Sequence, residues 1–244
     1  MTRLSHTFSR CVAFSLVGLV CGICSGANVT GTIELSRTPK AAQSGDESIS
    51  DIVVWLSPVH QNTIPILEPQ HAQLLQKDKM FHPHTLVITA GSTVDFPNAD
   101  PIFHNAFSNF DGQLFDVGLY PPGTSRSVRF RRAGIVRVFC NIHPTMFAVI
   151  VVLDTPYFTK ANRDGHYRLQ NVPPGIYDVQ VFDERATTQG SKVSVTVDEA
   201  QSPITALPIR LSEAGYVQSP HKNKYGLDYP PSSTEAETYT GLSK

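Results

Sequence analysis

Two apolar runs separated by seven residues constrain the fold of this chain more than any other feature of its sequence. The runs are residues 135–139 and 147–153, and both are rich in β-branched and aromatic residues. Short apolar runs of this composition predict buried strands. The seven residues between them, 140–146, therefore form a loop between two strands. This loop carries a thiol, an imidazole and a thioether.

These three side chains, Cys140, His143 and Met146, are candidate ligands of a soft metal ion. A thiolate, two imidazoles and a weak axial thioether form the ligand set of blue-copper electron-transfer sites. The loop supplies one imidazole, and His104 is the best candidate for the second. Soft sulfur favours Cu(I) and imidazole suits either oxidation state, so such a set suits copper that cycles between the two.

The first 27 residues look like an export signal. Arg3 and Arg10 form a positive n-region, residues 11–23 form an apolar core, and Ser-Gly-Ala at 25–27 forms a small-residue cleavage site. The apolar run is too short to span a bilayer comfortably, and no later run is long enough to cross a membrane. We therefore expect a cleaved signal peptide and a periplasmic mature chain with no transmembrane segment.

Cysteine usage and charge narrow the function further. Three of the four cysteines lie in the signal, so Cys140 is the lone thiol of the mature chain and no internal disulfide can form. An inert buried thiol is the alternative, but the fixed offsets of His143 and Met146 favour a ligand. The chain has 20 Lys and Arg against 21 Asp and Glu, without a basic patch, which argues against nucleic acid as a partner.

The mature chain shows strand periodicity throughout. Residues 29–35 and 193–197 alternate apolar and polar side chains, and residues 52–56 form a short apolar run. Residues 71–153 contain several short strand patterns separated by turns, without a helical period. This pattern predicts an all-β, antiparallel sandwich architecture. Residues 213–244 are rich in Pro, Ser, Thr and Tyr without any period, and we expect a mobile C-terminal tail.

Residues 71–153 resemble the cupredoxins. Residues 81–98 look like their N-terminal strand pair, and His104-Asn105 looks like their first ligand with the asparagine after it. Cys140-x-x-His143-x-x-Met146, with Pro144 after the histidine, is similar to the short ligand loop of amicyanins. The whole precursor is also similar to periplasmic plastocyanin-like proteins named methylamine utilisation proteins. In those, a Cys-Asn-Ile-His loop runs into a segment like residues 153–158 here.

The resemblance implies a Greek-key cupredoxin β-sandwich that holds one type 1 copper ion through His104, Cys140, His143 and axial Met146. It implies electron transfer between redox partner proteins, such as a dehydrogenase or a cytochrome. Around the ligands we expect Asn105, Asn141 and Pro144. The Asn105 side chain is expected to hydrogen-bond across to the ligand loop, and Pro144 stiffens that loop.

The flanking segments resemble a second sandwich. Asp-Gly-x-Tyr at 164–167 and Pro-Pro-Gly-x-Tyr at 173–177 look like the second half of a carboxypeptidase regulatory-like, transthyretin-like sandwich, and residues 29–57 look like its first half. Neither flank has enough strands for a core of its own. Our hypothesis is that residues 29–57 and 155–212 form one split sandwich, into which the cupredoxin domain at 71–153 is inserted.

Other functions stay open on the sequence alone. His82-x-His84 resembles the paired imidazoles of multicopper oxidases, but Phe139 and Asn141, not histidines, flank Cys140. The route to a second copper centre is therefore missing, and we expect no enzyme activity. The same ligands also suit copper trafficking or sensing. A further alternative is a non-redox adhesion or carbohydrate-binding sandwich with an accidental ligand set.

Overall fold

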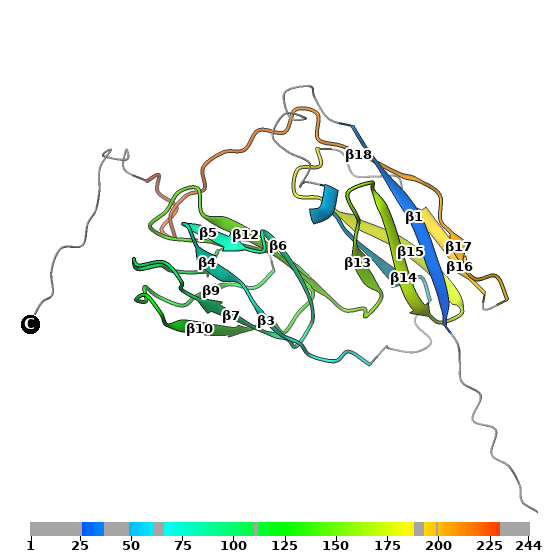
Figure 1. Ribbon diagram of the computed structural model, residues 1–244, viewed down its shortest axis with the longest axis horizontal. Coiled ribbons are helices and arrows are strands. Elements are labelled where there is room, and N and C mark those ends of the chain that lie inside the picture. Colours follow the sequence, from blue (N-terminus) through cyan, green and yellow to red (C-terminus); the bar gives the residue numbers. More distant parts are fainter. Residues whose placement is uncertain are drawn as a thin grey trace, which may run out of the picture.

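The computed structural model of the protein describes residues 26–36, 49–60, 66–109, 112–187, 193–198 and 200–229. Within these ranges the regular elements are strands, together with one 3-10 turn, η2 (Ile49–Asp51). The predicted all-β fold class is confirmed. Figure 1 shows the strands gathered into two bodies. No helix in the described ranges is long and apolar enough to cross a membrane.

The strands between residues 71 and 153 form the first body, which we call the ligand-bearing sandwich. One sheet has the order β6 (Thr85–Thr89), β12 (Phe147–Leu153), β11 (Gly134–Phe139), β8 (Phe107–Ser108) and β9 (Phe115–Asp116). The other has the order β10 (Ser125–Arg129), β7 (Thr93–Pro97) and β3 (His71–Gln73). A small hairpin of β4 (Leu75–Lys77) and β5 (Met80–His82) accompanies them.

The core of this sandwich lies between its two sheets. Phe96 of β7 packs in one buried cluster with Val136 and Val138 of β11. Cys140 and Met146 belong to the same cluster, and neither side chain is exposed to solvent. Both ends of the ligand loop are therefore continuous with a close-packed interior, which gives the loop a rigid base.

Strand β12 is buried on both faces, and this explains its unbroken apolar sequence. A half-buried strand alternates apolar and polar residues, whereas a strand covered on both sides need not. Alternate residues of β12 pack in two different clusters. Ala148, Ile150 and Val152 lie in the core of the ligand-bearing sandwich, and Val149, Val151 and Leu153 lie in a cluster with Val53 of the second body.

The second body combines strands from both ends of the chain. One sheet has the order β13 (Phe158–Lys160), β2 (Val53–Pro58), β15 (Gly175–Phe182) and β16 (Val193–Val197). In the other, β1 (Ala27–Ser36) pairs with β14 (His166–Val172), β17 (Ile204–Thr205) and β18 (Ile209–Ser212). One core cluster includes residues of both sheets. Among the described strands, β2 pairs with β13 and β15, which both follow the ligand-bearing sandwich in sequence.

The two bodies meet at a junction that is apolar at its centre and polar at its edge. Trp55, Phe158 and Phe182 of the second body pack against the outer face of β12. At the edge, the Lys160 ammonium donates to Thr85 O at 2.7 Å and lies 3.0 Å from Asp51 Oδ1. A second polar contact joins His84 Nε2 to Glu184 Oε2 at 2.5 Å.

The described residues include only part of each predicted terminal segment. Residues 1–25 of the predicted signal lie outside the described residues, and Ala27, at its end, is the first residue of β1 and is buried. The expected tail begins at 213, and its described part continues to Tyr229. Figure 1 shows this orange segment running from β18 back to the ligand-bearing sandwich, where it contacts the ligand loop.

Candidate metal centre

The ligand loop is a tight connection between β11 and β12. The antiparallel pairing of these strands ends at Phe139 and Phe147, so Cys140 follows the last paired residue directly. Within the loop, Cys140 N donates to Met146 O at 3.0 Å and Met146 N donates to His143 O at 3.1 Å. These two hydrogen bonds fold the loop back on itself and bring its first and last residues together.

His104 reaches the same place from a separate segment between β7 and β8. It forms an isolated β-bridge with Tyr120, in which His104 N donates to Tyr120 O at 3.2 Å and Tyr120 N donates to His104 O at 2.9 Å. Three residues further on, Phe107 pairs with Phe139. This pairing aligns the His104 segment with the end of β11, where Cys140 begins the ligand loop.

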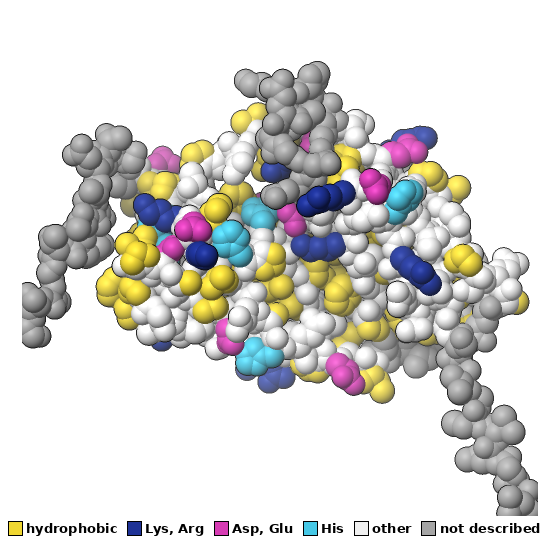
Figure 2. Space-filling view, viewed as in Figure 1, with side chains coloured by type: hydrophobic (Ala, Val, Ile, Leu, Met, Phe, Trp, Pro, Cys, Tyr) yellow, Lys and Arg dark blue, Asp and Glu magenta, His cyan; other side chains and the backbone are white. Residues whose placement is uncertain are grey.

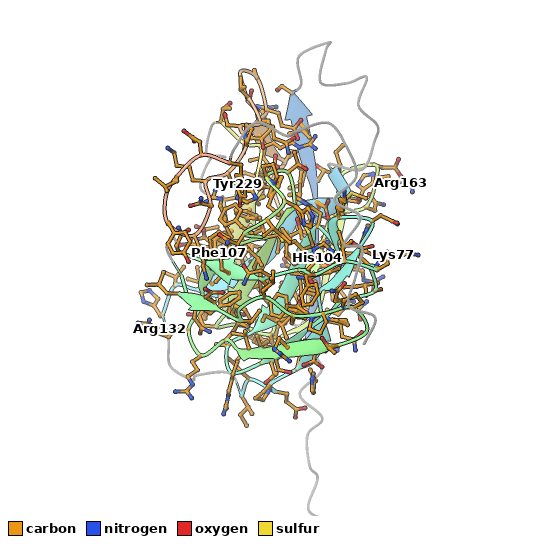
Figure 3. The ribbon with its side chains drawn as sticks, turned by 90° about the vertical axis from the view of Figure 1, so that its left-hand side faces the viewer. Lys77, His104, Phe107, Arg132, Arg163 and Tyr229 are labelled. Carbon is orange, nitrogen blue, oxygen red and sulfur yellow. The ribbon has the colours of Figure 1, made fainter. Side chains whose placement is uncertain are left out.

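The three predicted donors converge. The ligand atoms of His104, Cys140 and His143 all lie within 4.8 Å of one another. The Cys140 Sγ atom lies 3.4 Å from His143 Nδ1 and 3.8 Å from His104 Nδ1. The two imidazole rings are tilted by 59° with centroids 4.8 Å apart. His104 and Cys140 are fully buried and His143 is half-buried, so the site lies just below the surface (Figure 3 labels His104).

Burial and main-chain hydrogen-bond donors have opposite effects on the ionisation of the Cys140 thiol. Burial raises the pKa of Cys140, and the N–H groups of Ile142, Asn105 and His143 oppose this rise by donating hydrogen bonds to the sulfur. Donors of this kind favour the thiolate, the form that binds metals. Hydrogen bonds to a cysteine sulfur also tune the reduction potential of a copper ion bound there.

The His143 imidazole is held neutral. Burial, followed by the nearby His104 and Lys79, lowers the pKa of His143 to about 4, against a smaller opposite effect of Asp100. A neutral imidazole keeps a lone pair on one ring nitrogen and can act as a metal ligand without first losing a proton.

Asp100 holds His104 in place, a role that the sequence analysis missed. Its Oδ2 atom lies 2.7 Å from His104 Nε2, while Asp78 N and Lys79 N donate to the same carboxylate at 2.7 and 2.9 Å. Burial alone would raise the pKa of Asp100, but these hydrogen bonds hold it below its ordinary value. The only signal in the sequence was an acidic residue four positions before His104.

Met146 is buried in the same core cluster as Cys140, with no exposed surface. Pro144 lies half-buried within the loop. The Asn141 side chain bonds outside the loop, where its Oδ1 atom accepts from Lys224 N at 2.9 Å.

Asn105 differs from the expectation that its side chain reaches the ligand loop. Its Nδ2 group donates to Asp116 Oδ1 at 2.8 Å and to Gly118 O at 2.9 Å, and the main-chain N–H makes the contact with Cys140. The link between the two ligand segments is therefore made by the backbone, because the Asn105 amide is turned towards Asp116 instead.

The remaining histidines do not gather into a second site within the described residues. His82 is exposed and contacts Lys77 O at 3.3 Å, whereas His84 is paired with Glu184. His71 pairs with Asp95 at 2.7 Å. His221 is half-buried, and its Nε2 atom lies 3.2 Å from His143 O.

Comparisons with known proteins find similarity in solved structures. No protein-family model matches the chain, and no curated protein matches it. A purple cupredoxin from Nitrosopumilus maritimus is 26% identical over 34% of this chain and 99% of that chain, with a TM-score of 0.31. Amicyanin from Paracoccus versutus is 20% identical over 41% and 97% of the two chains, with a TM-score of 0.32.

A copper-containing nitrite reductase from Thermus scotoductus SA-01 is 23% identical over 49% of this chain and 28% of that chain, with a TM-score of 0.33. Solved cupredoxin structures are thus among the structural neighbours of the chain, and each of the three covers half of it or less. The chemistry of the site follows from its own residues.

Proposed function

We propose that this protein binds one copper ion through His104, Cys140 and His143, with Met146 as a weak axial donor, and carries single electrons between redox partner proteins. The observation that supports this most is the convergence of one thiol and two imidazole nitrogens within 4.8 Å. His104 lies 36 residues before Cys140 in sequence, whereas His143 shares the loop with Cys140, so the fold, and not local chain geometry alone, assembles the set.

The donor set fits copper on chemical grounds. Thiolate and thioether sulfur select soft ions, and two imidazoles with one cysteine match the trigonal set of blue-copper sites. Hard cations such as Mg²⁺ and Ca²⁺ prefer oxygen ligands, and the three convergent residues offer none. Zinc accepts the same three donors, so the test must distinguish zinc from copper.

The residues around the site are suited to electron transfer. Bound copper would supply a one-electron redox couple. Asp100 fixes the ring of His104, and main-chain N–H groups donate to the sulfur, so the donors need to move little when charge changes. Burial of His104 and Cys140 limits water, and half-buried His143 offers a route to the surface.

The surface next to the site supports contact with a protein partner. Phe103 and Ile142, which precede His104 and His143 in sequence, are 36% and 40% exposed. Figure 2 shows yellow hydrophobic side chains gathered at the left-hand end of the view. An apolar surface beside a half-buried ligand permits close, transient docking, which suits a carrier that exchanges electrons and transforms no substrate.

We also propose that the mature protein is exported to the periplasm, and that residues 71–153 are inserted in a regulatory-like sandwich made of residues 29–57 and 155–212. The pairing of β2 with β13 and β15 supports the second proposal. N-terminal sequencing of protein recovered from the periplasm tests export. We expect the sequence to begin after the predicted signal.

The visible spectrum of the copper-loaded protein tests the function. We expect an intense blue band and reversible one-electron reduction, and Cys140→Ser and His104→Gln should abolish the band. His82→Gln is the matched control and should retain it, because His82 is exposed and lies outside the donor group. A colourless protein that binds zinc but forms no thiolate–copper band would overturn the proposal.

A further inference from the structure

The described part of the C-terminal segment ends on the ligand loop. We call residues 221–229 the strap. After β18 the chain leaves the second body, and the strap lies against the ligand-bearing sandwich (Figure 1). In Figure 3, Tyr229 lies on this pale orange segment, on the same side of the molecule as Phe107.

Three hydrogen bonds join the strap to the loop. His221 Nε2 lies 3.2 Å from His143 O while its Nδ1 lies 2.9 Å from Lys222 O, and the Tyr229 hydroxyl donates to Cys140 O at 2.8 Å. Between them, Lys224 N donates to Asn141 Oδ1 at 2.9 Å. The accepting residues are three of the first four in the ligand loop, and two of them are proposed copper ligands. The strap therefore contacts the part of the loop that must move if the site opens.

Aromatic packing fixes the strap to the strands beneath the loop. The His221 ring lies 4.5 Å from the ring of Phe139, with an interplanar angle of 36°, and 6.5 Å from the ring of Phe107. The Tyr229 ring meets the His221 ring edge-on, with centroids 5.3 Å apart. His221 is thus packed between side chains of β11, β8 and the strap, which immobilises the donor to His143 O.

The strap is also tied to the segment that carries His104. The Lys224 ammonium lies 2.8 Å from Asp116 Oδ2, and the other oxygen of this carboxylate accepts from Asn105 Nδ2. Asn105 follows His104 directly. Through Lys224 the strap therefore contacts the loop directly at Asn141, and it reaches the His104 segment indirectly, through Asp116 of β9 and Asn105.

Internal contacts shape the strap itself. Asn223 Oδ1 accepts from Tyr225 N at 2.9 Å and from Leu227 N at 3.0 Å, and Asn223 N donates to Leu227 O at 2.9 Å. This asparagine-centred turn places His221 and Tyr229, eight residues apart, on the same loop. A preformed turn loses less conformational entropy when it binds than a free chain does.

From these contacts we infer that the strap is a clamp: His221 and Tyr229 are positioning residues that keep the ligand loop closed. The consequence for copper rests on the proposed function. Three of the four proposed donors, Cys140, His143 and Met146, lie on this loop, so a clamp that holds it closed is expected to slow metal loss and suits a carrier that keeps its copper. Each hydrogen bond of this kind changes an opening equilibrium by up to about tenfold.

The clamp can be tested on the full-length mature chain, first without metal. Tyr229→Phe with His221→Phe keeps an aromatic ring at both positions and removes the side-chain polar atoms that contact the loop. We expect amide hydrogen exchange in residues 140–146 to become about tenfold faster, while exchange in β15 stays unchanged. The matched control is Tyr225→Phe, the same chemical change in a strap residue that is 73% exposed and contacts Lys224; it should leave the loop unchanged.

The second measurement is the rate of Cu(I) loss to a chelator, which we expect to rise about tenfold in the double variant and to stay unchanged in Tyr225→Phe. If the double variant does not fold, Asn141→Ala removes a strap contact from the loop side, and the same rise in loop exchange is expected. Unchanged loop exchange, or a rise of equal size in β15, would overturn the clamp. Absence of a blue band would overturn only the copper proposal, because the exchange experiment needs no metal.

Discussion

The carboxylate of Asp100 lies 2.7 Å from Nε2 of His104, and both side chains are buried. A carboxylate held ionised can only accept, so Nε2 carries the hydrogen of this contact, and Nδ1, 3.8 Å from Cys140 Sγ, is the ring nitrogen that faces the candidate site. Partners of this kind fix the tautomer and the orientation of a ligating ring. The main-chain N–H groups of Asp78 and Lys79, at the tip of the β4–β5 hairpin, hold Asp100 in turn. A chain of contacts therefore runs from this hairpin through Asp100 and His104 to the Cys140 sulfur.

Asp100→Asn should weaken copper binding by roughly 10–100-fold, because the ring of His104 loses its anionic partner. A competition titration with a Cu(I) chelator measures this change. Asp95→Asn is a matched control, since Asp95 pairs with exposed His71 at the same 2.7 Å distance on the surface. Equal affinities for the two variants would mean that Asp100 does not position the ligand.

Met146→Leu should keep the copper and raise its reduction potential. The change removes the proposed axial sulfur, and the axial donor tunes the potential of such sites. Leucine is close to methionine in volume, so the buried cluster around Cys140 should tolerate it. Redox titration followed at the blue band gives the answer, and a potential equal to that of the unmodified protein would exclude Met146 as the axial donor.

Two buried tyrosines should respond in opposite ways to loss of the hydroxyl. Tyr120 Oη lies 2.7 Å from Gln76 Oε1 and 2.8 Å from Phe96 O, two acceptors that share its one hydrogen, behind the bridge that holds His104. Tyr167 OH is buried without a hydrogen-bond partner among the described residues. Tyr120→Phe should therefore lower the free energy of unfolding by about 1–3 kcal/mol, and Tyr167→Phe should raise it by up to about 1 kcal/mol.

Urea unfolding of the metal-free protein measures both changes, and each variant serves as the control for the other. The prediction fails if the two variants shift the unfolding free energy in the same direction by similar amounts.

Asp183 should make the stability depend on pH. Burial raises its pKa from 3.8 to about 6, reinforced by Glu213 and Glu184 and opposed by the Arg185 N–H and the Arg185 charge. The folded chain therefore binds this proton more tightly than the unfolded chain, and stability is lost as pH rises from 3.8 to about 6. Asp183→Asn should stabilise the protein by about 1 kcal/mol at about pH 7.5, after allowance for solvent screening, and by almost nothing at about pH 4.

This prediction is tested by measuring the unfolding free energies of the unmodified protein and of Asp183→Asn at both pH values. A stabilisation of the same size at both values would show that packing, and not the charge of Asp183, is responsible.

The strands and the convergence of the metal-ligand candidates could be predicted from the sequence. The alternation in residues 193–197 predicts the buried valines of β16, and the spacing of Cys140 and His143 places both on one loop. His104 could be selected because it follows a loop directly, and the asparagine after it added a resemblance to the first ligand of cupredoxins. Each of these depends on neighbours in sequence, where periodicity and spacing are informative.

Hydrogen bonds between residues that are distant in sequence could not be predicted from such local patterns. Residues 213–229 have the composition of a tail, yet His221 and Tyr229 bond to residues 78 and 89 positions earlier. The turn of the Asn105 amide towards Asp116 likewise depends on where β9 lies. No local pattern records such contacts, because the fold creates them.

The chain has a single tryptophan, and it lies where the two bodies meet. Trp55 packs there against Phe158 and the outer face of β12, on the side opposite to the core that contains Cys140. Its fluorescence is therefore a natural reporter of separation between the two bodies. An experimenter can follow that separation in the unmodified protein without adding a dye.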